Sequence, residues 1–276
     1  METDVDLGLF GPQSVSWRVH AEPVLWAAGL RALYLQALHP RAIAGVLQNS
    51  DIRRDPWGRL MRTADYVGTV VFGTTTDAQA AGSRVRRIHE RLRARDPVTG
   101  EEFRIDEPEL LRWIHVTEVE SFVSTARRAG APLSTADIDE YFAEQTRAAA
   151  LVGLDPGTVP ASAPEVEQYY RQMRPDLAAS RLTAEAVRLL TLPPMPRLVG
   201  LAGGRLGMLT LSAVGFALLP RWARRLYGLP GLPTTDLSAT VTVRALRRTL
   251  AVIPGALEGP IYQDAMRRAE LAARAA

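Results

Sequence analysis

Apolar residues recur with helical spacing along almost the whole of this 276-residue chain. Over residues 56–72, for example, Leu60, Val67 and Val71 stand seven and four positions apart, so they share one face of a helix. Runs in which β-branched residues alternate with polar ones are nearly absent, and residues 239–243 are the one ambiguous stretch. The sequence therefore predicts an all-α fold.

The ends of the expected helices are marked by proline, glycine and capping residues. Pro56 suits the first turn of a helix, where its missing N–H costs little, and Gly73 suits the position just after the end. Thr76 or Asp77 can cap the helix that follows. We expect helices over residues 22–38, 40–47, 56–72, 77–93, 107–129, 135–152, 165–173, 183–192, 198–219, 235–251 and 260–275, and a loop over 96–106.

No internal repeat, low-complexity tract or long linker divides the chain. The proline- and alanine-rich run at 155–164 is expected to be a surface connection. The length suffices for a sizeable core in one large domain or two small ones. Because no linker is found, we expect residues 1–276 to form a single domain, with its last helices in 230–276.

The chain contains no cysteine, which excludes disulfides, zinc–thiolate sites, iron–sulfur clusters and thiolate-ligated haem. A bound metal must therefore be held by histidine, carboxylate, tyrosine or methionine. The histidines are His20, His39, His89 and His115. They form a short list of candidate metal ligands.

All basic residues are arginine, a bias typical of GC-rich bacterial genomes such as those of actinomycetes. The formal net charge is only +3, and the arginine pairs form neither an extended stripe nor a set interleaved with aromatic residues. Nucleic-acid binding is therefore not expected. Arginine does matter for other ligands, since its rigid fork holds carboxylates and rarely loses its proton.

Residues 1–13 are acidic and lack the apolar region of a signal peptide, which favours a cytoplasmic location. Residues 198–219 are almost continuously apolar and about as long as a membrane span. Arg205 would be costly in lipid, so a buried or surface-docked helix is the favoured interpretation. Because an arginine-rich stretch follows, peripheral membrane contact through residues 198–225 stays open.

The helix expected at 56–72 carries a polar stripe on one face, made of Arg59, Arg62, Thr63 and Tyr66 at i, i+3, i+4 and i+7. Two guanidinium groups, a hydroxyl and a phenol beside an apolar stripe suit a carboxylate-bearing ligand. The alternative is a solvated face whose arginines pair with surface acids. The pattern by itself leaves both interpretations open.

On the next expected helix, His89 lies at the margin of an apolar stripe, beside Val85 and Leu92. A neutral imidazole in such a position can bind haem iron through Nε2. The alternative is an ordinary half-buried histidine. His115 has no Glu-x-x-His partner, so a di-iron carboxylate site is not expected. Nor does the chain contain HExxH, a phosphate-binding glycine loop or a G-x-S-x-G turn.

A series of short motifs runs through the chain in a defined order. It contains Leu-Gln-Ala-Leu-His-Pro at 35–40, Arg-Leu-Met-Arg-Thr at 59–63, Val-Phe-Gly at 71–73, Val-Arg-Arg-Ile-His at 85–89 and Leu-Arg-Trp-Ile-His at 111–115. In this order and spacing the motifs resemble the bacterial MpaB-type family, which includes the latex-clearing (rubber) oxygenases. The resemblance covers about residues 17–229.

The resemblance implies an all-α protein that binds haem b and uses O2 to cleave a C=C bond of an isoprenoid. It implies His89 as the proximal iron ligand, and Arg59 and Thr63 as residues of the haem pocket. Arg62 falls where the rubber oxygenase has a lysine that caps the iron, a role that a permanently protonated arginine fills poorly. Arg59, Arg62 and Thr63 are the expected catalytic residues, which neutralise the propionates or polarise oxygen.

The sequence thus predicts a haem-dependent oxygenase for an apolar substrate such as an isoprenoid, a lipid or a secondary metabolite. Tyr66 and His115 complete the expected cofactor-binding set. No residue matches the glutamate base of the rubber oxygenase, although Gln36 and His39 lie near the right region. The alternatives are a non-catalytic haem- or lipid-binding protein, and a relative that has lost its cofactor and serves as an interaction module.

Overall fold

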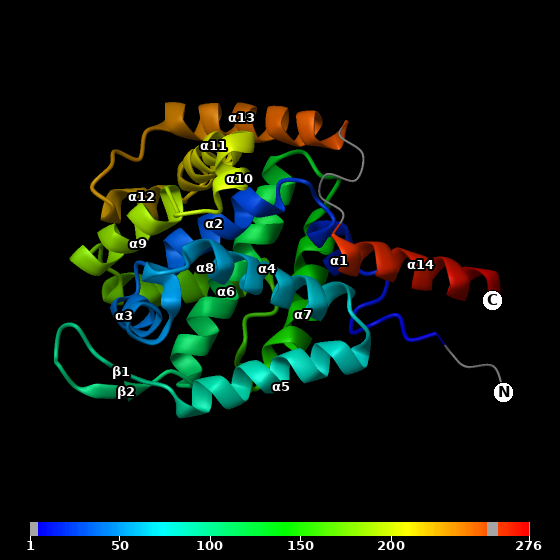
Figure 1. The fold of residues 1–276 in the computed structure, drawn as a ribbon, viewed down its shortest axis with the longest axis horizontal. Coiled ribbons are helices and arrows are strands. Elements are labelled where there is room, and N and C mark those ends of the chain that lie inside the picture. Colours follow the sequence, from blue (N-terminus) through cyan, green and yellow to red (C-terminus); the bar gives the residue numbers. More distant parts are fainter. Residues whose placement is uncertain (1–4, 253–258, 276) are drawn as a thin grey trace.

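Helix α6 (Pro108–Arg128) lies at the centre of the structure and packs along α2 (Leu25–Gln36) (Figure 1). Helices from both halves of the chain also contact α6. Its Trp113 is completely buried, which makes this helix the middle of the hydrophobic core. The computed structural model describes residues 5–252 and 259–275.

The all-α fold expected from the sequence is confirmed, because one small hairpin is the only sheet among the described residues. Apart from the segment 198–219, the expected helices end within about three residues of their predicted bounds, whereas the short helices Val15–His20 and Arg221–Leu226 were not expected. The ambiguous residues 239–243 are helical. The other elements are α1 (Val15–His20), α3 (Pro40–Asn49), η1 (Asp51–Arg53), α4 (Pro56–Phe72), α5 (Thr75–Arg91), β1 (Arg93–Arg95), β2 (Glu102–Arg104), α7 (Thr135–Leu151), η2 (Pro156–Thr158), α8 (Ala163–Met173), η3 (Arg174–Asp176), α9 (Arg181–Thr191), α10 (Arg197–Val199), η4 (Gly200–Gly204), α11 (Arg205–Ala217), α12 (Arg221–Leu226), α13 (Pro233–Ala251) and α14 (Pro260–Ala275).

Side-chain caps fix the start of α4 and of α5. The Asp55 carboxylate accepts a hydrogen bond from the Gly58 backbone N–H at 2.8 Å. Thr74, rather than the expected Thr76 or Asp77, caps α5, since its hydroxyl accepts from the Asp77 backbone N–H at 3.1 Å. The Asp77 carboxylate accepts from the Thr74 N–H in return, which completes a capping box.

The loop expected at 96–106 is wrong in part, because β2 lies within it and pairs with β1 in an antiparallel hairpin. Ala94 pairs with Phe103, and both side chains are buried. Strands of three residues are too short to show the alternation by which a strand is recognised. Gly100 in the turn has a positive φ of 76°, which glycine adopts without strain.

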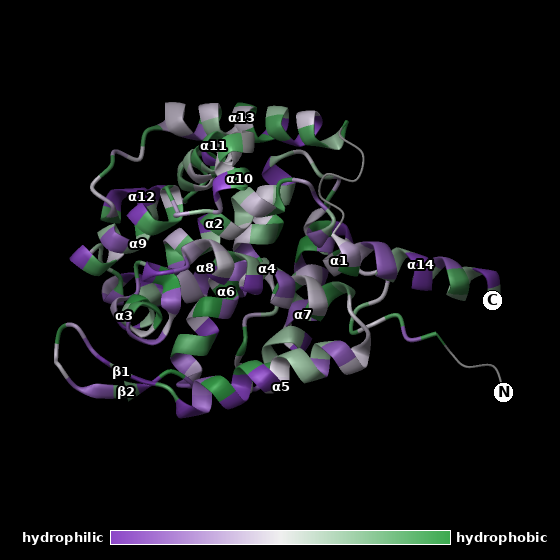
Figure 2. Ribbon diagram, in the orientation of Figure 1, coloured by the Kyte–Doolittle hydropathy of each residue, from purple (hydrophilic) through white to green (hydrophobic). Residues whose placement is uncertain are grey.

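The apolar segment 198–219 is not one continuous helix. It is divided into α10, the π-helical turn η4 and α11, and Gly203 at the break has a positive φ of 88°. None of the helices in the described part of the chain is long and apolar enough to cross a membrane. Helix α11, which is largely hydrophobic in Figure 2, instead packs on α2, where a Cβ on Gly215 would lie 2.9 Å from the Ala27 carbonyl oxygen.

Candidate functional site

An apolar cavity of about 570 Å³ is lined by α2, α3, α4, α5 and α6. Its volume is typical of small-molecule sites, which combine a mostly apolar wall with a few polar groups. Leu33, Leu60 and Ile114 belong to the apolar wall. Ile261 and Tyr262, at the start of α14, complete it.

Three of the residues selected from the sequence line this cavity together: Arg59 and Thr63 of α4, and His89 of α5. Arg59 and Thr63 are one helical turn apart, so both side chains face the same way. His89 stands in the last turn of α5. Because α5 folds back against α4 after their common corner, residues that are far apart in the sequence reach one space.

The His89 imidazole meets the conditions for a metal ligand. Burial lowers the pKa of His89, the Arg59 guanidinium lowers it further, and Asp106 acts in the opposite direction. The ring is therefore neutral near pH 7, with a lone pair available. Its Nδ1 is buried without a hydrogen-bond partner among the described residues, and the residue belongs to the cavity lining.

The Arg59 guanidinium is a partly buried cation without an acidic partner. Among the residues that the structure describes, it forms no ion pair and no side-chain hydrogen bond. Burial lowers the pKa of Arg59, and the neighbouring Arg62 adds to that effect. Buried charges in proteins usually have a partner, so an unpaired guanidinium in a cavity wall indicates a site for an anionic ligand group.

Thr63 is held by its own helix. Its hydroxyl donates to the Arg59 backbone carbonyl at 3.0 Å, the usual bond of a helical threonine to the residue four positions earlier. The donor is therefore used, while the oxygen keeps acceptor capacity. Thr63 can accept a hydrogen bond from a ligand without any change of its rotamer.

Arg62, Tyr66 and His115 are not among the residues that line the cavity. The Arg62 side chain is 63% exposed and forms an ion pair with Asp55 at 3.2 Å. Burial, together with the Glu118 carboxylate, raises the pKa of Tyr66. Burial lowers the pKa of His115 to about 4. The structure thus divides the set expected from the sequence, and only Arg59, Thr63 and His89 share the cavity.

Glu118 of α6 lines the cavity but was not selected from the sequence. It has no hydrogen bond or ion pair with any described residue, and burial raises the pKa of its carboxyl to about 7. Glu120, two positions later, instead pairs with the buried Arg31 of α2 at 2.6 Å. The sequence does carry a signal for Glu118, because it interrupts an apolar helix face that includes Ile114 and Phe122.

His20, at the end of α1, is a second polar residue of the wall that was not selected. Its Nε2 lies 3.0 Å from the Tyr141 hydroxyl, and its Nδ1 is buried without a partner among the described residues. The ring meets Phe122 edge-on, with centroids 4.8 Å apart. Burial lowers the pKa of His20 to about 3, so the ring is neutral. No local pattern distinguishes it from an ordinary helix-end histidine.

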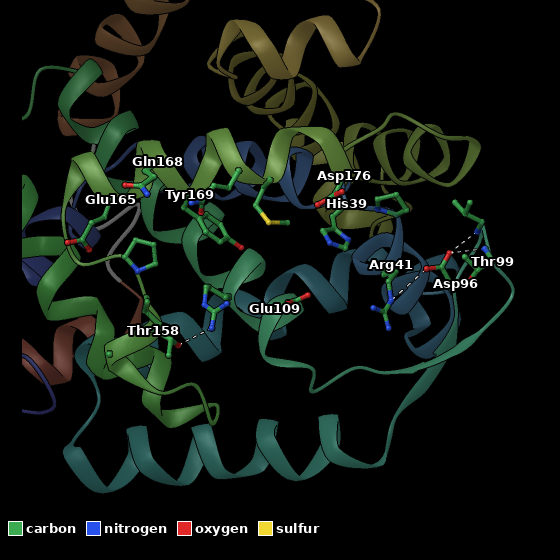
Figure 3. Close-up of a pocket in the computed structure, with 18 residues that line it drawn as sticks. His39, Arg41, Asp96, Thr99, Glu109, Thr158, Glu165, Gln168, Tyr169 and Asp176 are labelled. Atoms are coloured by element: carbon green, nitrogen blue, oxygen red, sulfur yellow. Dashed lines mark hydrogen bonds and ion pairs between the residues drawn. The ribbon is translucent and has the colours of Figure 1, made fainter.

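A more open, polar groove of about 770 Å³ lies beside the cavity, and His39 belongs to its wall (Figure 3). Several of its charged groups have partners: Arg41 lies 3.7 Å from Asp96, and the Arg112 guanidinium donates to the Thr158 hydroxyl at 3.0 Å. Arg41 lines the groove and the cavity alike, so its side chain stands between them. The apolar cavity, with its unpaired polar groups, is the better candidate for the functional site.

The residues of the cavity fit a haem. Within the described residues, no three His, Asp or Glu side chains come together as a site for a bare metal ion. The single imidazole of His89 suits a haem iron, for which the macrocycle supplies the other in-plane ligands. The apolar wall suits the macrocycle, and the Arg59 cation suits its carboxylate side chains.

Comparison with known protein families identifies a match over most of the chain. The family model described as "ER-bound oxygenase mpaB/B'/Rubber oxygenase, catalytic domain" matches residues 17–252. The matched range contains Arg59, His89 and Glu118, but not the α14 residues of the cavity wall. No curated protein and no solved structure matches the chain.

Proposed function

The chain belongs to the catalytic-domain family of the mpaB-type and rubber oxygenases, and from this premise we propose that it is a haem b-dependent oxygenase that acts on an apolar substrate with O2. Family membership supports the oxygenase activity. The haem and the apolar substrate are supported by one observation above all: a neutral histidine and an unpaired buried arginine share an apolar cavity.

Each residue would have a separate part in binding and protection. The bound haem would supply the activation of O2. His89 would hold the iron through Nε2, and Arg59 would neutralise an anionic group of the cofactor. The apolar wall would exclude water from the reacting atoms, which strengthens electrostatic interactions inside the cavity and suppresses side reactions.

An ultraviolet–visible spectrum of the purified protein tests the cofactor. We expect a Soret band in the protein as isolated or after addition of haemin, and a shift of this band after dithionite and CO. His89→Ala is expected to abolish the band at stoichiometric haemin. His115→Ala is the matched control, because this second buried histidine lies outside the cavity lining and its loss should leave the band intact.

Two outcomes would contradict parts of the proposal. A protein that is colourless as isolated and leaves the absorption spectrum of added haemin unchanged has no haem site. A protein that binds haem through His89 but consumes no O2 with any apolar alkene, measured with an oxygen electrode, would instead be a non-catalytic haem-binding protein.

We further propose that the protein meets its substrate at a membrane surface, through α10, η4 and α11. Leu198, Leu201 and Leu206 are 82%, 85% and 70% exposed. Between Glu185 and Asp236 the sequence contains no acidic residue, whereas arginine recurs. Large exposed apolar side chains among basic residues are typical of surfaces that bind anionic lipid.

Sedimentation with vesicles tests this contact. Vesicles of phosphatidylcholine with phosphatidylglycerol should bind the protein more strongly than phosphatidylcholine alone. The double substitution Leu198→Ser and Leu201→Ser should reduce the bound fraction severalfold, since it removes the apolar part of the contact. Val98→Ser, an equally exposed position in the hairpin turn, is the control. Vesicle binding that the double substitution leaves unchanged would contradict the assignment.

A further inference from the structure

The cavity has two polar ends, and the proposed function uses only the one with His89 and Arg59. Asp106 influences the pKa of His89, so this first end lies beside the start of α6. Glu118 stands ten positions after Pro108, the first residue of α6. At a rise of 1.5 Å per residue, it lies about 15 Å further along the helix axis.

Helix α4 gives an independent measure of the same separation. Arg59 acts on the pKa of His89, whereas Tyr66, seven positions later, is influenced by the Glu118 carboxylate. Seven helical residues correspond to about 10 Å. The two polar ends therefore lie on the order of 10 Å apart along these helices, and most of the residues that line the cavity are apolar.

The second end is built from hydrogen-bonding groups that are neutral or unpaired. Glu118 has no partner among the described residues, and no arginine contributes to its environment. His20 is 5% exposed, and its Nδ1 has no partner in the part of the chain that the structure describes. Tyr141 is fully buried and already bonded to His20. Groups left unsatisfied in this way are costly in a folded protein unless a ligand satisfies them.

We propose that Glu118, with His20 beside it, binds a hydroxyl group at one end of a long apolar substrate, an assignment that rests on the proposed function. A hydroxyl both donates and accepts, so it can bond to a carboxyl in either protonation state. A carboxylate in the same place would be repelled by ionised Glu118. A cation would have to lose its hydration inside an apolar cavity.

This arrangement fixes the register of the substrate. With its hydroxyl at Glu118, the apolar chain extends through the cavity toward the haem that His89 would hold. The separation of the two ends then decides which bond of the chain reaches the first end. The product is expected to be cut at one distance from the hydroxyl rather than at several positions.

Competition between matched ligands tests the assignment. Dodecan-1-ol, dodecane and dodecylamine are titrated against the purified protein carrying the fluorescent probe N-phenyl-1-naphthylamine, and displacement is measured. We expect the alcohol to bind roughly tenfold more tightly than the alkane, the effect of one well-made hydrogen bond in a buried site. The amine should show no advantage over the alcohol.

Three variants separate recognition from general packing. Glu118→Leu should remove the preference for the alcohol but keep dodecane binding. Glu118→Gln retains a donor and an acceptor and should keep most of the preference. Glu109→Leu is the matched control, because Glu109 is an exposed acid on the same helix, outside the cavity lining, and its loss should change neither ligand.

The outcomes distinguish this proposal from the haem assignment. Equal binding of alcohol and alkane by the wild type, tighter binding of the amine, or no displacement by any ligand overturns it, even if the protein carries a His89-dependent Soret band. A colourless protein that still prefers the alcohol, and loses this preference in Glu118→Leu, overturns the proposed function and supports the hydroxyl site.

Discussion

Replacing Arg59 with leucine is expected to stabilise the haem-free protein while weakening its hold on haem. Arg59 lies in an apolar wall and has no acidic partner among the described residues. Folding therefore takes its positive charge out of water without compensation. Leucine removes the charge and matches the apolar surroundings, so the folded state gains relative to the unfolded chain.

The size of this gain follows from the burial of Arg59. A fully buried unpaired ion costs several kcal/mol even after the surroundings relax. Arg59 is only partly enclosed, so we expect the free energy of unfolding to rise by about 2 kcal/mol rather than by the full amount. For a chain of this length, such a gain raises Tm by about 5 °C.

Thermal and urea denaturation of the haem-free proteins measure the gain, and haemin titration measures the loss of affinity, which we expect to be about tenfold or more. Arg62→Leu is the control on the same helix. Arg62 is mostly exposed and paired with Asp55, so its replacement should change the free energy of unfolding by less than about 1 kcal/mol.

A haem-free Arg59→Leu protein that melts below the wild type would refute this reasoning. Such a result would mean that the guanidinium has favourable partners in the fold and is not held in place for a ligand. Unchanged haem affinity would contradict a separate step, the pairing of Arg59 with anionic groups of the cofactor.

The other predictions concern the pH profile, access and packing. Because burial raises the pKa of Glu118 to about 7 from its usual 4.5, the contribution of Glu118 to the free energy of unfolding should fall as pH rises from 4.5 to 7. The test is the difference in free energy of unfolding between Glu118→Gln and the wild type, measured by urea denaturation at each pH. This difference should move in favour of the variant by about 1–3 kcal/mol between pH 4.5 and 7. The buried histidines titrate in the opposite sense, but they contribute equally to both proteins and cancel in the difference. Arg41→Ala should speed entry of an apolar dye about tenfold in stopped-flow fluorescence, since Arg41 stands between groove and cavity. In Gly82→Ala, the new Cβ would lie 2.5 Å from the Leu151 Cβ, so thermal denaturation should show a loss of about 1–3 kcal/mol, with weaker haem retention because α5 carries His89.

Helix α4 illustrates both the reach and the limit of prediction from the sequence. Its two ends were predicted correctly, because proline and glycine mark them. Its polar stripe was predicted as one face, yet the structure divides it. At about 100° per residue, the apolar face is centred between Leu60 and Val67. Thr63 and Arg59 lie within about 90° of that centre and Arg62 about 150° away, so only the first two reach the cavity.

Local pattern marks Glu118 as a polar interruption of an apolar helix face, but it does not say whether Glu118 has a partner. Glu118 and Glu120 are two positions apart on α6, and nothing in their immediate sequence says which of them meets a partner. Because α2 packs against α6, Arg31 forms an ion pair with Glu120, whereas Glu118 lines the cavity. His20 reaches the same wall only because α1 packs on α6 and α7. Contacts between helices that are distant in the sequence decide which polar groups become a site.

The start of α14 adds residues outside the family match to the cavity wall. The family match ends at residue 252, yet Ile261 and Tyr262 line the cavity, and Tyr262 packs edge-on against Phe72 at the end of α4. The Ile261 side chain approaches Gly68, two positions after Tyr66 and thus near the Glu118 end. His89, His20 and Glu118 all belong to the matched range, whereas the wall near Glu118 is completed by a helix outside it. The shape of the cavity near Glu118 therefore depends partly on residues that the family match does not cover, because the Ile261 side chain lies beside Gly68.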